Sequence, residues 1–337
     1  MTETNTGKSE FLSPTVSLRG LFATVRLVVF LLAVVSCLAT IFGFLGKYSW
    51  FLDLFSHFRV QYMLGLGFVA AIFFLSGNRQ VAFVFSGFAL INLGLVLPLY
   101  FGGRDLPGNI GKPVRAMLLN VNTQNGDPKR VEKLVRETDP DILVLEEIDF
   151  MWMNELSGLA DLYAHSQVRE REDNFGIGLF SKFPLIDAEI VDIGGSVPSI
   201  VATIATDQGQ LRIIAAHPLP PANAEYSKGR NEQFERLPNY TDSPLPLILV
   251  GDLNTTSWSH HFKKMLKRTG LIDSSQGLGV QATWPSTLPM LLIPLDHFLH
   301  SPEVFVLKKK IGPNVGSDHY PVIVDFVIWD GEDGRRL

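Results

Sequence analysis

Cysteine is nearly missing from this sequence. Cys37 is the single one among 337 residues, so no disulfide or cysteine-based zinc site can form within the chain. Charged residues are also scarce, at 19%, and 34 acidic residues against 29 basic ones give a formal net charge of −5. Proteins that bind duplex nucleic acid through its phosphates need a basic surface, so this balance argues against that class.

Hydrophobic residues, 46% of the chain, are concentrated in the first hundred positions. Three uncharged runs, at about 27–46, 60–76 and 81–101, predict transmembrane helices, since roughly 20 apolar residues are needed to cross a bilayer. Only residues 77–80 separate the last two runs, which predicts a tight helical hairpin. A cleaved signal peptide is the alternative for the first run. It is disfavoured because no clear small-residue cleavage site follows and two more spans do.

The remaining organisation follows from composition. Residues 1–20 are predicted to be a flexible polar tail, 21–103 the membrane module, 104–113 a Gly/Pro-rich linker and 114–337 a second domain. Three spans place the two chain ends on opposite sides of the membrane. Lys8, Arg19, Arg26 and Arg79 flank the spans on one side, and keeping these positive charges inside places the second domain outside.

The second domain alternates apolar strands with amphipathic helices, which predicts an α/β fold. Strands are expected at 116–120, 142–146, 176–180, 211–215, 247–250 and 322–328. Val131, Leu134 and Val135 recur at helical spacing before Asp139 and predict one of the helices.

Polar residues able to bind a cation or a phosphate lie at the ends of several of these strands. Those that end a strand or follow it are Asn120, Asn122, Glu146, Glu147, His217, Asp252 and Asn254; Asp296 follows a Pro-rich loop, and Asp318 and His319 come just before the last strand. One such residue alone is usually a turn former, a helix cap or a structural histidine. Strand ends are rigid, however, and this many coincidences in one domain indicate a functional site.

The segments that carry these residues occur as LNVN, PDILVLEEI, GIGLFSKFPL, AAHP, GDLN, LDHFL and GSDHYPV. In this order they resemble the endonuclease/exonuclease/phosphatase superfamily over residues 113–329. The resemblance implies a four-layer α/β sandwich, with two mixed sheets packed face to face and helices outside. It also implies a phosphoester hydrolase that uses Mg²⁺, with Mn²⁺ as a substitute.

The resemblance carries roles to individual positions. It implies the metal ligands Asn120, Glu147 and Asp318. It implies the catalytic residues His217, Asp252, Asn254, Asp296 and His319. The substrate-binding set is Asn122, His217, Asn254 and Trp284. Asp252 would deprotonate the attacking water, and Asp296 would position His319 on the scissile phosphate.

These residue types suit phosphoester hydrolysis by their own chemistry. An anionic nucleophile must approach an anionic phosphate, and a hard cation held by carboxylate and amide oxygens reduces that repulsion. Imidazolium and amide donors then stabilise the charge that builds on the phosphate oxygens. Glu146 is expected to support the site by hydrogen bonding, and His297 to face away from it. His165, His260, His261 and His300 have no motif context and are predicted to be surface residues.

The apolar segment WPSTLPMLLIP at 284–294, close to Asp296, bears on which substrate the site accepts. It is either a loop packed on the core or an apolar lip able to contact a lipid. With the spans, it favours a membrane-proximal or lipid-linked phosphoester over DNA or RNA. A membrane-anchored nuclease and a catalytically silent binding module remain as alternatives. The nearest resemblance is to bacterial membrane-bound proteins, which predicts a multi-pass inner-membrane protein with its catalytic domain on the periplasmic side.

Overall fold

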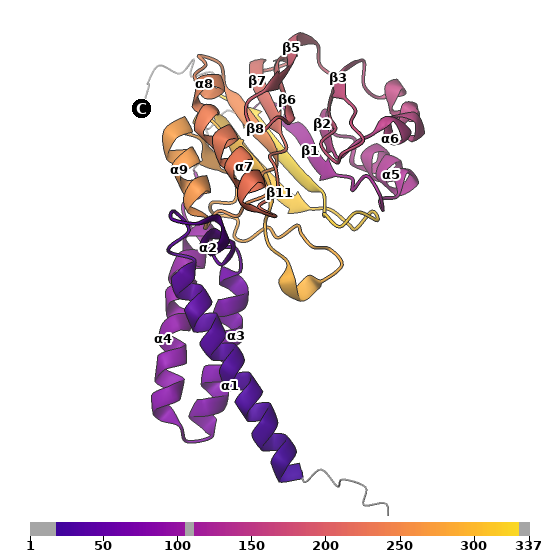
Figure 1. Ribbon diagram of the computed structural model, residues 1–337. Helices are drawn as coiled ribbons and strands as arrows, with labels where there is room; N and C mark the ends of the chain where they lie inside the picture. The colour runs from indigo at the N-terminus through magenta and orange to yellow at the C-terminus, as the bar shows by residue number, and fades with distance from the viewer. Residues whose placement is uncertain (1–17, 105–110, 330–337) are drawn as a thin grey trace, which may run out of the picture.

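The computed structural model describes residues 18–104 and 111–329, which form a long helical bundle joined end-on to an α/β domain (Figure 1). Two mixed six-stranded sheets make up the domain. The first sheet has the order β11 (Val304–Ile311), β12 (Val322–Ile328), β1 (Val114–Asn120), β2 (Ile142–Glu146), β4 (Ile177–Ser181) and β3 (His165–Arg169). The second has the order β5 (Leu185–Asp192), β6 (Pro198–Thr206), β7 (Gly209–Ala216), β8 (Leu247–Asp252), β10 (Asp296–His300) and β9 (Ile272–Asp273).

Each sheet contains one parallel pair, β1 with β2 and β7 with β8, among antiparallel neighbours. A core of buried aliphatic and aromatic side chains, Val144, Ile213 and Phe298 among them, lies between the two sheets. Two further cores lie on the outer faces, under α5 (Pro128–Thr138) and α6 (Phe150–Glu155) on one side and α7 (Ala224–Arg236) and α9 (His260–Thr269) on the other. The predicted four-layer α/β sandwich is therefore confirmed.

Local signals account for the best-predicted elements. Helix α5 begins at Pro128 after Asp127, whose side chain accepts a hydrogen bond from the Arg130 amide, and it ends at Asp139 in the left-handed conformation. All six predicted strands are present, with bounds shifted by a few residues. Strands β3, β5, β6, β9, β10 and β11 lie outside the predicted set.

The N-terminal module contains α1 (Leu18–Phe42), the short α2 (Trp50–Leu54), α3 (Arg59–Leu75), α4 (Arg79–Val96) and η1 (Leu97–Tyr100). Within the described residues, two helical stretches, Gly20–Phe42 and Arg79–Tyr100, are long and apolar enough to cross a membrane by length and composition. Helix α3, with 17 residues, is shorter. The predicted hairpin between the second and third runs is present as α3 and α4.

The helix ends in this region differ from the ends of the predicted spans. Helix α1 begins at Leu18, inside the predicted tail, and ends at Phe42, four residues before the predicted end of the first span. The chain turns at Gly43, where a Cβ atom would lie 2.3 Å from the Arg59 guanidinium, so a side chain has no room there. Residues 1–17, most of the predicted linker (105–110) and residues 330–337 lie outside the described residues.

Candidate active site

The functional side chains meet where neighbouring strands of both sheets end. Register places Asn120 of β1 opposite Glu146 of β2, and Asp252 of β8 opposite Asp296 of β10. The paired strands β7 and β8 approach closely here: a Cβ atom on Gly251 would lie 1.9 Å from the Ala216 carbonyl oxygen, so glycine is required at that position. This close approach explains the glycine in the GDLN segment.

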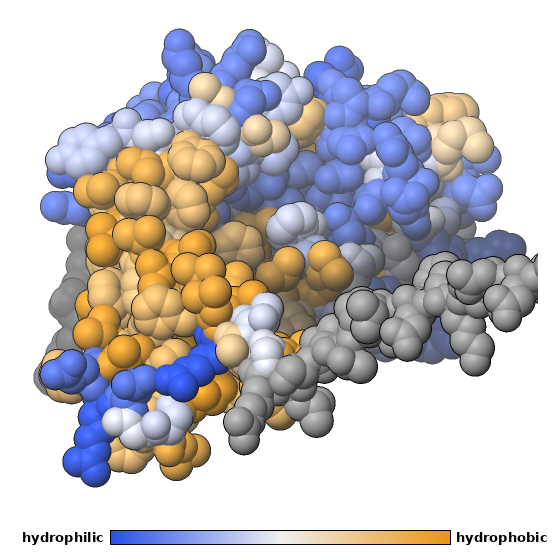
Figure 2. Space-filling view, turned by 60° about the horizontal axis from the view of Figure 1, so that its bottom comes forward, coloured by the Kyte–Doolittle hydropathy of each residue, from blue (hydrophilic) through white to orange (hydrophobic). Residues whose placement is uncertain are grey.

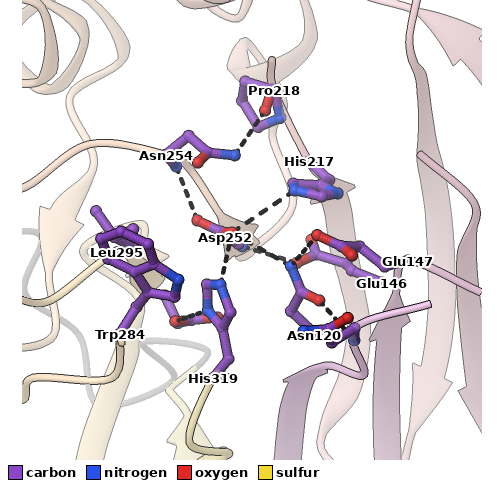
Figure 3. A network of polar contacts seen from close by, with 12 residues as sticks. Asn120, Glu146, Glu147, His217, Pro218, Asp252, Asn254, Trp284, Leu295 and His319 are labelled. Atoms are coloured by element: carbon purple, nitrogen blue, oxygen red, sulfur yellow. Dashed lines mark hydrogen bonds and ion pairs between the residues drawn. The ribbon is translucent and has the colours of Figure 1, made fainter. Parts of the chain in front are cut away.

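Asp252 lies at the centre of the site (Figure 3) and is only 2% exposed. Its Oδ2 lies 3.6 Å from His217 Nε2, 3.5 Å from His319 Nε2 and 3.4 Å from Asn120 Nδ2. Its Oδ1 accepts a hydrogen bond of 2.9 Å from the Asn254 amide. Burial acts to raise the pKa of Asp252, but the two imidazoles and the Asn254 amide outweigh it and lower the pKa. Asp252 is therefore an ionised carboxylate at neutral pH.

His319 is held by Asp296, as the resemblance implied. Its Nδ1 lies 2.9 Å from Asp296 Oδ2, and both side chains are buried. Burial acts to lower the pKa of His319, but Asp296 and Asp252 raise it to about 10. The imidazole is therefore charged at neutral pH, with Nε2 directed at Asp252.

His217 is the second charged imidazole. Burial acts to lower its pKa, but Asp252, Glu146 and Glu147 together raise the pKa to about 9. Phe175 lies beside its ring, with centroids 5.6 Å apart. The site thus presents two imidazolium groups around one carboxylate, an arrangement that can bind an anionic group and accept a proton at the same place.

Glu146 supports the site, as predicted. Its Oε2 accepts a hydrogen bond of 2.9 Å from the Asp252 amide, and the side chain is fully buried. Burial raises the pKa of Glu146 to about 8, against the opposing effect of His217. A carboxyl group in this state fixes the Asp252 backbone and adds little negative charge at neutral pH.

Glu147 and Asn120 form the part of the site that suits a divalent cation. Asn120 Nδ2 donates a 2.8 Å hydrogen bond to Glu147 Oε1, and Glu147 lines the cavity described below. Mg²⁺ binds through one or two carboxylates and keeps several waters, so the Glu147 carboxylate suits the ion, while Asn120 orients that carboxylate and its own Oδ1 accepts a 3.0 Å hydrogen bond from the Asn122 amide. In residues 18–104 and 111–329, no group of three or more His, Cys, Asp or Glu residues is arranged to hold a metal.

Asp318 has both carboxylate oxygens engaged. Oδ1 accepts a 2.8 Å hydrogen bond from Asn122 Nδ2, and Oδ2 accepts one of 3.0 Å from Trp284 Nε1. Trp284 in turn lies beside the His319 ring, with centroids 6.4 Å apart. Asn122 and Trp284 thus belong to the same cluster, and the role of Asp318 as a metal ligand stays a prediction.

Three site residues other than glycine have left-handed backbone conformations: Asn122 (φ 58°), Glu147 (φ 61°) and Asn254 (φ 50°). Such conformations are uncommon and collect at functional sites, where the surrounding structure holds them in place. Each follows a strand, so the left-handed residue turns the chain across the end of the sheet. This geometry explains why the polar side chains converge.

A cavity of about 610 Å³ opens onto these residues. Sequence reasoning missed part of its lining: Leu54, His57, Phe58, Asp173, Asn174, Phe175, Pro220, Pro221, Ala222 and Tyr226. Leu54, His57 and Phe58 belong to the helical module, and no local signal in the sequence connects them with a site some two hundred residues away. His57 is buried, its Nδ1 lies 3.0 Å from Thr256 Oγ1, and burial lowers its pKa to about 4.

Two histidines outside the cavity lining are structural. His297 faces away from the site, as predicted: its Nε2 lies 2.9 Å from the Thr255 carbonyl oxygen and its ring packs on Phe262. His300, predicted to be at the surface, is buried, with Nδ1 2.9 Å from the Ser301 carbonyl oxygen. Strand β10 is covered on both faces, which the alternation of its residues did not reveal.

The family model described as Endonuclease/Exonuclease/phosphatase family matches residues 117–319, which include every predicted site residue. This chain belongs to that family. The family generally comprises phosphoester hydrolases that depend on a divalent metal. No curated protein matches the chain.

Solved structures from several organisms share the fold. The endonuclease/exonuclease/phosphatase from Beutenbergia cavernae superimposes with a TM-score of 0.53 and 18% identity, over 65% of this chain and 72% of that chain. The human Nocturnin catalytic domain with bound sulfate gives 0.52 and 20%, over 65% and 96%. TDP2 from D. rerio, complexed with a single-strand DNA product, gives 0.53 and 15%, over 64% and 99%. At these identities the likeness concerns the fold alone.

Proposed function

We propose that this protein is a membrane-tethered, metal-dependent phosphoester hydrolase that prefers a membrane-proximal or lipid-linked phosphoester. The observation that carries the proposal is the composition of the cavity. Asp252, His217 and His319 form its polar side, while Leu54 and Phe58 of the helical module contribute apolar side chains to the same cavity. A substrate whose phosphate is joined to an apolar group would place the phosphate on the polar side of the cavity and the apolar group on the other side.

The chain's own residues account for most of the chemistry. Asp252, ionised at neutral pH, accepts a proton from the attacking water. His319 and His217, charged at neutral pH, donate to phosphate oxygens as negative charge builds on them. Asn254 lines the cavity and its Nδ2 donates to the Pro218 carbonyl oxygen at 3.0 Å, which supports a role for its second N–H in binding a phosphate oxygen.

The cation would be held by Glu147 with Asn120 beside it. When bound, Mg²⁺ or Mn²⁺ supplies charge neutralisation for the phosphate and the leaving oxygen. Carboxylates outnumber imidazoles in the cluster even without Glu146: four of them, Glu147, Asp252, Asp296 and Asp318, lie around His217 and His319. This excess of acidic groups supports a requirement for a cation.

The apolar lip supports the lipid-linked preference. Loop residues Leu288 and Met290 are 56% and 89% exposed, while Ile293 and Leu295 of the same segment line the cavity. The loop that carries η3 (Pro289–Leu291) descends from the domain on the side where the helical bundle lies (Figure 1). Exposed apolar side chains at that level are placed to enter a membrane interface.

Hydrophobic residues gather over the helical bundle, whereas the surface of the α/β domain is mostly hydrophilic (Figure 2). Leu32, Phe68 and Phe83 are among the outward-facing apolar residues of α1, α3 and α4. Such a surface is typical of helices in lipid. We propose that all three long helices span the membrane, with the catalytic domain on its outer side as the positive residues before α1 and in the hairpin turn favour.

The nuclease alternative has less support from the cavity. Among the described residues that line it, none is Lys or Arg, although polyanionic nucleic acid is held mainly by such side chains. The single-strand DNA product is bound in the TDP2 structure, so for this chain single-stranded DNA is only one of the substrates to test. A catalytically silent binding module is disfavoured because each predicted catalytic position holds a competent side chain.

The test uses the full chain in detergent micelles with a chromogenic phosphodiester, a phosphomonoester, phospholipid vesicles, and single-stranded and duplex DNA. Each substrate is assayed with Mg²⁺, with EDTA, and with Asp252→Asn as the matched blank. We expect hydrolysis that EDTA and Asp252→Asn both abolish, and that is faster with lipid than with DNA. Cleavage of DNA with lipid untouched would make the protein a nuclease, and silence on every substrate would contradict the proposal.

A further inference from the structure

The helical module contacts the loop that carries the catalytic residues of β8. Asp53 of α2 accepts hydrogen bonds from Ser259 Oγ at 2.9 and 3.0 Å, and His57 lies 3.0 Å from Thr256 Oγ1. The Trp258 indole donates to the Leu95 carbonyl oxygen, at the end of α4, at 3.1 Å. The second half of this loop, residues 256–259, therefore contacts the module directly.

One of these connections is a buried ion pair between the two regions. Arg230 of α7 is 0% exposed and Asp53 is 1% exposed, and Arg230 Nη2 lies 3.1 Å from Asp53 Oδ2. Burying a charge is costly unless a partner and hydrogen bonds compensate it. The compensation for Arg230 therefore depends on a residue of the helical module, 177 positions away in the sequence.

The same guanidinium reaches the catalytic loop. Arg230 Nη1 donates a 3.0 Å hydrogen bond to the Asn254 carbonyl oxygen. Asn254 has a φ of 50°, its amide donates to Asp252 Oδ1 at 2.9 Å, and its side chain donates to the Pro218 carbonyl oxygen. A residue in this uncommon conformation is kept there by its contacts, and Arg230 provides the one on its carbonyl group.

We propose that Arg230 is a positioning residue for the reaction, and that Asp53 makes the helical module part of the catalytic machinery. Arg230, oriented by Asp53, fixes the Asn254 peptide, and the Asn254 amide fixes the carboxylate of Asp252. The module thereby does more than anchor the domain: it completes the geometry of the general base. This inference rests on the proposed function, because it assigns Asp252 that role.

The test is Arg230→Lys in the full chain, assayed on a soluble chromogenic phosphodiester with Mg²⁺ so that lipid access plays no part. Lysine keeps the charge, but its single ammonium cannot form the fixed fork that reaches Asp53 and Asn254 together. We expect kcat to fall about ten- to a hundredfold with KM nearly unchanged, since small misplacements of a catalytic group have effects of that size.

Arg59→Lys is the matched control. Arg59 is 1% exposed and lies in the module, but its hydrogen bonds go to the Thr40 carbonyl oxygen and Asn92, away from the catalytic loop. We expect Arg59→Lys to keep the wild-type kcat, with thermal unfolding used to compare the folded state of all variants. An equal loss of kcat in both variants, or a folded Arg230→Lys with wild-type kcat, would overturn the positioning role.

Hydrogen exchange provides a readout that needs no turnover. Amide exchange in the peptide covering 251–259 should be faster in Arg230→Lys than in the wild type and unchanged in Arg59→Lys. If Arg230→Lys exchanges faster but the wild-type protein hydrolyses none of the substrates, the proposed function would be contradicted, while the structural link from Asp53 through Arg230 to Asn254 would stand. Unchanged exchange together with an active Arg230→Lys would overturn the connection while the proposed function stands.

Discussion

The α/β domain and the helical module contribute to the same cavity but differ in what their sequences reveal. In the domain, His217 and Asp252 lie at the ends of apolar strands and His319 lies just before one, and both imidazoles lie within 3.6 Å of the Asp252 carboxylate. In the module, Leu54, His57 and Phe58 lie in a short connection between apolar helices, with no pattern that indicates a site. Local sequence patterns therefore indicate the catalytic side chains, whereas the apolar side of the cavity depends on how two distant regions of the chain pack together.

The largest expected effect comes from removing the general base. Asp252→Asn should lower turnover by about 10³-fold, because proton transfer and the placement of the water are both lost. The asparagine keeps the volume of the buried side chain but removes the charge that faces His217 and His319, so thermal unfolding must be measured beside activity. A variant that stays folded and retains more than about a tenth of wild-type turnover would place the chemistry elsewhere, since each catalytic group usually contributes 10²-fold or more.

Asp296→Asn should have the next largest effect, about 10²-fold at neutral pH. Asp296 and Asp252 raise the pKa of His319 to about 10, so the charged form persists until the pH rises through that value. Removing one of the two carboxylates lowers that pKa, and the alkaline limb of the pH–rate profile should move to lower pH. An alkaline limb that stays in place would show that His319 does not act in its charged form.

The domain's part of this site could largely be predicted because each residue is fixed by a local element. The apolar runs of β1, β2, β8 and β12 can be recognised in the sequence, and these strands place Asn120, Glu147, Asp252 and His319 at or next to their ends. The pairing of the strands then brings the residues together. The left-handed turns at Glu147 and Asn254 were not predictable, since their neighbours and not their own propensities hold them.

The module's part could not be predicted in the same way. Apolar runs are visible because a bilayer requires length and hydrophobicity, so three spans were expected; α1, α3 and α4 lie at these runs, and two of the helical stretches are long and apolar enough to cross a membrane. The short helix α2 and the buried pair of Asp53 with Arg230 depend on long-range packing, and a lone Asp between two spans has no periodicity to indicate a partner. Burial of His300 likewise follows from packing on both faces of β10.

A smaller effect is expected from the lip. Leu288→Ser with Met290→Ser should lower turnover of phospholipid vesicles about tenfold, because these side chains would no longer enter the membrane interface. Turnover of a soluble phosphodiester should stay at the wild-type rate, which serves as the internal control. Equal rates on vesicles would show that the loop has no part in reaching lipid.

Phe58→Ala should give the smallest change, and it tests how much a side chain of the module contributes to substrate binding. Phe58 lines the cavity from the start of α3, so its loss should raise KM for a lipid-linked substrate about three- to tenfold while kcat stays nearly constant. A soluble substrate without an apolar group should show no difference. A matching increase of KM for both substrates would indicate a general disturbance of the cavity.

The central claim, that one cavity joins phosphoester chemistry to an apolar wall, is tested most directly with a pair of substrates. The two share one phosphodiester, and only one of them carries a long acyl chain; both are offered in micelles to the full chain with Mg²⁺. We predict a kcat/KM at least about tenfold higher for the acylated substrate, the factor that burying two methylene groups would give, and no turnover of either by Asp252→Asn. Equal kcat/KM values for the pair would contradict the claim.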